Sequence, residues 1–94
     1  MDAREVIIRP IVSERSFEMI EHGRYTFEVD KRASKPQIAS AVTEIFGVTV
    51  TGVNTMNVTG KPRRLRYAKG TTRSWKKAVV TLKEGDSIEF FEGH

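Results

Sequence analysis

The 94-residue chain contains no cysteine, which excludes disulfide bonds and thiolate metal sites and fits a reducing compartment. It also lacks any long apolar run, and its charged N-terminal region offers only short apolar pieces. These features argue against a signal peptide and a membrane-spanning helix, and they predict no direct insertion into a membrane. We therefore expect a cytoplasmic protein with a single domain, residues 1–94, and one modest core.

Motifs for catalysis or cofactor binding are scarce. The two histidines, His22 and His94, fall in an expected turn and at the C-terminus. No group of histidines and carboxylates has the spacing of metal ligands, and no glycine-rich motif would cradle a phosphate. The sequence thus predicts no catalytic residue, no metal and no cofactor, and a small enzyme is the least favoured functional class.

Acidic residues are absent from one stretch in which basic residues gather. Residues 60–77 hold eight of the 16 lysines and arginines and no acid, whereas the rest of the chain carries eight basic and 12 acidic residues. The basic residues of this stretch are Lys61, Arg63, Arg64, Arg66, Lys69, Arg73, Lys76 and Lys77. So concentrated a positive field attracts polyanions, and the rings of Tyr67 and Trp75 within it suit stacking on bases. The pattern predicts a nucleic-acid-binding segment.

Two other interpretations of this stretch stay open. A basic run also fits a solvated, disordered loop, and Trp75 also fits half-buried packing at the start of a strand. The stretch has neither zinc-finger spacing nor the aromatic signature of an RNA-recognition strand. We therefore expect contacts mainly to phosphates and sugars, with stacking by Tyr67 or Trp75.

Two helices are predicted from their caps and apolar spacing. The first begins at Ser13, turns Phe17 and Ile20 inward and ends near Gly23. The second begins at Ser34 and ends at Gly47. Its start has Pro36 in the first turn and Gln37 at the capping-box position. Its inward stripe consists of Ile38, Ala41, Val42, Ile45 and Phe46.

Alternating or β-branched segments predict strands at residues 25–30, 48–59 and 76–82, with possible short strands at each end, one of them at 87–91. Gly52 is expected to mark a bulge in the second of these strands. The strands on either side of the basic stretch most simply pair as an antiparallel hairpin. We predict an α+β fold, a two-layer sandwich of an antiparallel sheet with helices on one face. A long basic hairpin loop at about residues 60–74 would extend from it.

The order of motifs resembles one known family. Residues 9–16, RPIVSERS, resemble the P-x-x-(S/T)-E-K opening of the large-subunit ribosomal protein L23 family, bacterial type. Residues 53–55 and 60–61, followed by the basic run, match its middle, and residues 75–82, WKKAVVTL, are similar to its most characteristic stretch. The resemblance covers essentially the whole chain in order. One departure is Ser74, where family members often carry an acid.

The resemblance implies a structural, non-enzymatic protein of the large ribosomal subunit. It would bind large-subunit rRNA beside the polypeptide exit tunnel and contact neighbouring large-subunit proteins. It also implies docking of trigger factor, signal recognition particle and the translocon, with Glu14 as the trigger-factor contact. The residues alone favour Glu14 as an exposed acid that stabilises the dipole of its helix, with a protein-docking surface as the alternative. The alternative function is a free-standing regulatory module that binds nucleic acid or a protein partner.

Overall fold

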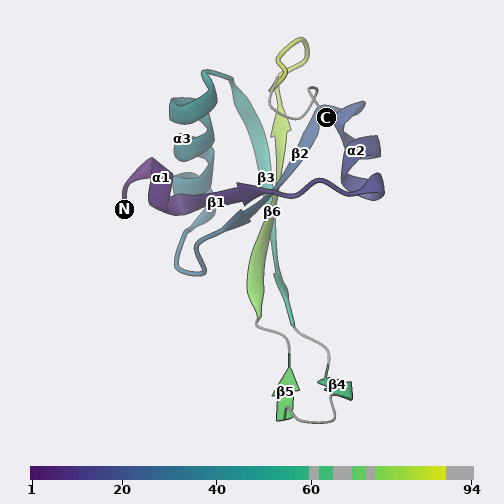
Figure 1. Ribbon diagram of the computed structural model, residues 1–94. Coiled ribbons are helices and arrows are strands. Elements are labelled where there is room, and N and C mark those ends of the chain that lie inside the picture. The colour runs from purple at the N-terminus through teal and green to yellow at the C-terminus, as the bar shows by residue number, and fades with distance from the viewer. Residues whose placement is uncertain (60–61, 65–68, 72–73, 89–94) are drawn as a thin grey trace.

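The computed structural model describes residues 1–59, 62–64, 69–71 and 74–88. Within them, the main antiparallel sheet places four strands side by side in the order β1 (Ile7–Pro10), β2 (Arg24–Val29), β6 (Trp75–Leu82) and β3 (Val50–Val58) (Figure 1). The helices are α1 (Ala3–Val6), α2 (Glu14–Ile20) and α3 (Lys35–Phe46). This confirms the α+β class and the antiparallel sheet. In the described part of the chain, no helix is long and apolar enough to cross a membrane.

Both predicted helix starts are confirmed. Ser13 caps α2 by accepting a bond from the backbone amide of Ser16, whose own hydroxyl accepts from the amide of Ser13 at 2.7 Å. Ser34 caps α3 in the same reciprocal way with Gln37, whose Oε1 accepts from the Ser34 amide at 2.8 Å. At the other end, Gly47 adopts a left-handed conformation with φ of 65° and stops α3. These are local signals, so sequence alone located them.

The main core lies between α3 and one face of the sheet. It is formed by alternate residues of two central strands and the inward stripe of α3, namely Tyr25, Phe27, Val29, Ala78, Val80, Leu82, Ile38, Ala41 and Val42. The rings of Phe27 and Phe46 lie 5.7 Å apart between centroids. Ile45 was expected in this stripe but is 41% exposed. It lies beside Ala3 and Arg4 of α1. Because α1 is a helix of only four residues, it covers only part of α3 and leaves Ile45 partly exposed.

The second helix departs from the predicted layering. Figure 1 shows α2 on the other side of the sheet from α3, beside β2. Ser16 and Met19 face the sheet, whereas Phe17, expected inward, is 43% exposed. Ser16, Met19 and the half-buried Ile20 share one helix face at i, i+3 and i+4, and Phe17 is rotated away from it. As a result Thr26, on the sheet face away from the main core, is buried.

The predicted pairing of β3 with β6 is confirmed, and Val58 lies opposite Trp75 at the base of the basic hairpin loop. The register shifts between Val50 and Gly52, where a bulge was expected. Beyond Val58, β4 (Pro62–Arg64) and β5 (Lys69–Thr71) form a separate antiparallel pair that lies past the ends of β3 and β6 (Figure 1).

Two predictions, the basic loop and a C-terminal strand, lie partly outside the described residues. Of the predicted 60–74 loop, only β4, β5 and Ser74 lie within the described residues. Of the strand predicted at 87–91, Ser87 and Ile88 are not in a strand, and the remainder also lies outside the described residues.

Candidate nucleic-acid interface

The start of β6 carries three of the residues predicted to bind RNA. Trp75, Lys76 and Lys77 are all half-buried there. Because side chains alternate along a strand, Trp75 and Lys77 lie on the face away from the main core, and Lys76 lies on the other. The Nζ of Lys76 donates a 2.6 Å hydrogen bond to the backbone carbonyl of Ala33. Lys76 therefore joins the base of the hairpin to the β2–α3 turn.

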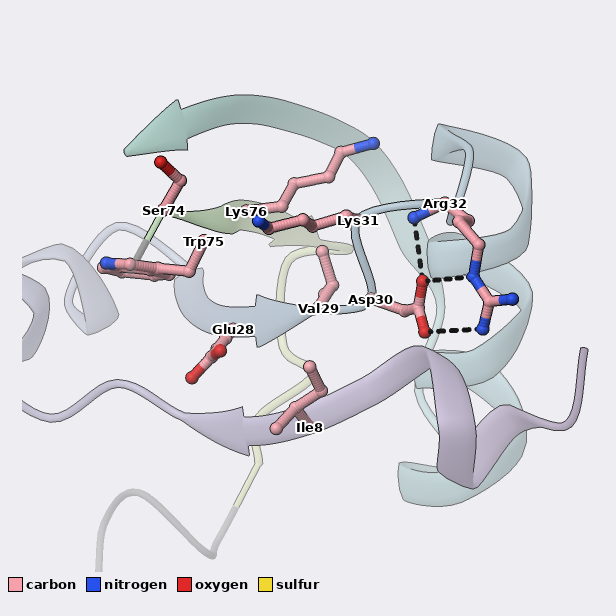
Figure 2. A pocket seen from close by; sticks show the side chains of 9 residues that line it. All are labelled: Ile8, Glu28, Val29, Asp30, Lys31, Arg32, Ser74, Trp75 and Lys76. Carbon is pink, nitrogen blue, oxygen red and sulfur yellow. Dashed lines mark hydrogen bonds and ion pairs between the residues drawn. The ribbon is translucent and has the colours of Figure 1, made fainter. Parts of the chain in front are cut away.

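A hollow of about 400 Å³ lies at this base, and we call it the basic hollow; Figure 2 labels the nine residues that line it. Trp75 stands at one end, and the pair of Asp30 and Arg32 stands at the other. Lys31 and Arg32, both exposed, contribute cations from the β2–α3 turn. The sequence alone did not link this turn to the basic stretch, because the turn lies more than forty residues before Trp75 and only the β2–β6 pairing brings the two together.

An ion pair neutralises one acid of the basic hollow. Arg32 donates to the Asp30 carboxylate from Nε at 3.1 Å, from Nη2 at 3.2 Å and from its backbone amide at 2.8 Å. These hydrogen bonds, the side-chain ones foremost, hold the pKa of Asp30 below its usual value, and the same contact raises the pKa of Arg32. Lys31 makes no ion pair with any described residue. The charge left for a ligand at this end is therefore positive.

The other acid of the basic hollow is also paired. Glu28 is almost fully buried, and its Oε1 accepts a 2.7 Å hydrogen bond from Nε of Arg9 on the neighbouring strand. The two residues are directly opposite each other in the β1–β2 register. A buried carboxylate without a cation would be costly and would repel phosphates, and Arg9 removes both problems. The alternation along residues 25–30 did not indicate that Glu28 would be buried.

The remaining predicted RNA-binding residues belong to the hairpin. The backbones of Arg63, Arg64 and Lys69 lie in β4 and β5, where Arg64 is opposite Lys69. Four others lie outside the described residues, namely Lys61, Arg66, Tyr67 and Arg73. The structure thus brings Trp75, Lys76 and Lys77 together with two cations that sequence analysis missed. The assignment of the hairpin cations stays a prediction.

Glu14, the predicted docking residue, is exposed in the first turn of α2, directly after its cap Ser13. Figure 1 shows α2 beside the main sheet, whereas β4 and β5 lie beyond the ends of β3 and β6, away from α2. Glu14 is therefore distant from the cations of β4 and β5. Among the described residues, no group of histidines and carboxylates is arranged to hold a metal ion.

Comparison with known proteins gives consistent results. A family profile described as "Ribosomal protein L23" matches residues 5–90. The chain is 52% identical over 93 residues to the large ribosomal subunit protein uL23 of Roseiflexus castenholzii, a match that covers 99% of each chain. It is also 52% identical to uL23 of Symbiobacterium thermophilum and 46% identical to uL23 of Treponema denticola, each over 99% of both chains.

Proposed function

The chain belongs to the ribosomal protein L23 family, whose members are structural proteins and not enzymes, and on this premise we propose that it binds large-subunit rRNA as a constituent of the large ribosomal subunit. Its position there would be beside the polypeptide exit tunnel. The observation that carries this proposal is the match with uL23 proteins over 99% of the chain at about half identity. The physical arrangement of charge supports it independently.

The proposed RNA contact begins at the basic hollow and continues along the hairpin. Lys31 and Arg32 flank the hollow, Trp75 offers a ring, and the eight cations of residues 60–77 supply charge without a competing acid. Cations that neutralise phosphates release counterions and so produce affinity that falls with salt. Most of these contacts would go to the RNA backbone, and such contacts fix the position of the protein rather than read the sequence. The paired strands at the base of the hairpin would orient them.

A second proposed contact lies on α2. Glu14 would dock trigger factor, and the surrounding face would serve signal recognition particle and the translocon. Two observations support this. Glu14 is exposed, and α2 lies away from β4 and β5, so Glu14 would remain accessible while that part of the hairpin is engaged with RNA (Figure 1). Neighbouring large-subunit proteins would contact other parts of the domain, and the complex would be cytoplasmic.

Sedimentation of a native lysate tests the ribosomal assignment. In moderate salt the protein is expected to travel with the large subunit, and footprinting on purified large-subunit rRNA is expected to show protection near the tunnel exit. A protein that stays at the top of the gradient, yet still binds RNA after purification, would instead be the alternative, a free-standing regulatory module.

A further inference from the structure

A second hollow, of about 350 Å³, lies between α2 and the sheet face away from α3, and we call it the α2 hollow. Its walls include the apolar side chains of Met19, Met56 and Val79, and Trp75 stands between it and the basic hollow. The volume is at the lower end of the range for small-ligand sites. Two methionines in its wall are flexible enough to repack around a flat ring.

Thr26 lines this hollow and carries an unpaired hydroxyl. Thr26 is only 3% exposed, and its Oγ1 is fully buried without a hydrogen-bond partner in the described part of the chain. Its backbone carbonyl is already used, because it accepts from the amide of Ile11 at 2.9 Å. A buried hydroxyl left unpaired destabilises the folded state, and such a group in a native structure calls for an explanation. A hydroxyl both donates and accepts, so either kind of ligand edge would satisfy it.

The charge around the α2 hollow has one sign. Arg15 and Lys77 line it, and none of the described lining residues is acidic. On α2, Arg15 and Met19 are four residues apart and share the face toward the hollow, whereas Glu14 and Glu18 lie on the adjacent face, outside it. A ligand here would meet apolar walls, one aromatic ring, one hydroxyl and two cations.

We propose that the α2 hollow holds one unpaired base of the bound RNA. The base would stack on Trp75, and its phosphate would lie near Arg15 and Lys77. Its edge would hydrogen-bond with Thr26 Oγ1 after Met19 or Met56 shifts to open a path to this buried atom. Unpaired bases are commonly bound in this way, by stacking on an aromatic ring and by hydrogen bonds to their edges. The inference rests on the proposed binding of large-subunit rRNA, and it adds a specific site at the base of the hairpin, apart from the cations of β4 and β5.

The decisive variant is Thr26→Val, which keeps the β-branched shape and removes the hydroxyl. Loss of the unpaired hydroxyl is expected to raise the Tm of the free protein, so a folding defect is not the expected complication. Affinity for purified large-subunit rRNA should nevertheless fall roughly two- to tenfold, the range expected for one lost hydrogen bond. The salt dependence should stay unchanged because no cation is lost. Thr81→Val, on the same sheet face but outside the hollow, is the matched control and should bind as wild type.

Fluorescence gives a second reading, since Trp75 is the only tryptophan in the chain. Stacking predicts that rRNA quenches its emission and shields it from acrylamide, and that Thr26→Val weakens the shielding. Trp75 also lines the basic hollow, so the Thr26 variant is what assigns the effect to the α2 hollow.

The outcomes separate this inference from the proposed function. If wild-type protein binds rRNA with a steep salt dependence but Thr26→Val binds equally well, the base site is wrong and rRNA binding stands. If wild-type protein does not bind rRNA at all, the proposed function fails and the base site fails with it. If Thr26→Val leaves rRNA affinity intact and weakens a protein partner on ribosomes, the hollow takes a protein side chain and the inference is overturned.

Discussion

The ammonium group of Lys76 lies 2.6 Å from the backbone carbonyl oxygen of Ala33, in the β2–α3 turn, and donates a hydrogen bond to it. One of the eight cations of the basic stretch thus serves the fold. Lys77, its neighbour, lies on the opposite sheet face and lines the α2 hollow. Adjacent lysines of one sequence motif therefore have different roles.

Replacing each of these lysines separately tests this division. Lys76→Gln should lower the free energy of unfolding by about 1 to 2 kcal/mol, because a charge-assisted hydrogen bond that is partly shielded from water is lost. It should change the salt dependence of RNA binding little. Lys77→Gln should do the reverse, with a flatter salt dependence and nearly unchanged stability. Urea denaturation and filter binding measure the two quantities, and equal stability of both variants would contradict the structural role of Lys76.

The ion pair of Asp30 and Arg32 predicts a specific titration. Because Arg32 holds the pKa of Asp30 below its usual value, the stabilisation that this pair provides is present above the ordinary aspartate pKa. It is lost as the pH falls through the lowered value in the folded protein. Carboxyl carbon NMR of wild-type protein should show an Asp30 midpoint below 3.8, the ordinary value, and Arg32→Gln should move it upward. An identical midpoint in both proteins would show that the contact does not persist in solution.

Glu14 provides a test of the docking face. Glu14→Ala should weaken the binding of trigger factor to ribosomes by about 1 to 3 kcal/mol, as expected when one partner of an interfacial charge pair is lost. Stability should fall by only about 0.3 to 1 kcal/mol, because an acid in the first helical turn favours the helix dipole. Co-sedimentation of trigger factor with ribosomes measures the first effect, and thermal melts of the free protein measure the second.

Glu18→Ala is the matched control, because Glu18 is exposed on the same helix one turn later. It should leave the affinity for trigger factor unchanged. Equal loss in both variants would indicate a general effect of charge, and no loss in Glu14→Ala would leave Glu14 as a helix-stabilising acid alone.

Local chemistry explains why much of the fold could be predicted. A cap such as Ser34 and a stop such as Gly47 act within one helical turn, and the alternation along β2 and β6 predicted both strands correctly. The misses depend on partners distant in sequence. Glu28 is buried because Arg9, nineteen residues earlier, pairs with it across the sheet. The periodicity within β2 therefore could not predict the contact between Arg9 and Glu28.

The candidate site shows the same division. Composition alone located the basic stretch and Trp75, since eight cations without an acid form a local signal. Lys31, Arg32 and Arg15 join the site only through the pairing of β2 with β6 and through the position of α2 on the far face of the sheet. Because we expected both helices on one face of the sheet, we could not predict that α2 would bury Thr26 on the other face.

The most direct test of the central claim is a salt titration of binding to large-subunit rRNA. The test protein is the triple variant Arg63→Gln, Arg64→Gln and Arg66→Gln. The control removes the same net charge from exposed positions elsewhere, with Arg4→Gln, Arg24→Gln and Lys35→Gln. If the hairpin binds phosphates, the hairpin variant should lose affinity. Its slope of log K against log salt should flatten by about two to three, since each phosphate contact contributes roughly 0.7 to 0.9. The control should keep nearly the wild-type slope. Equal slopes for the hairpin variant and wild type would contradict the account.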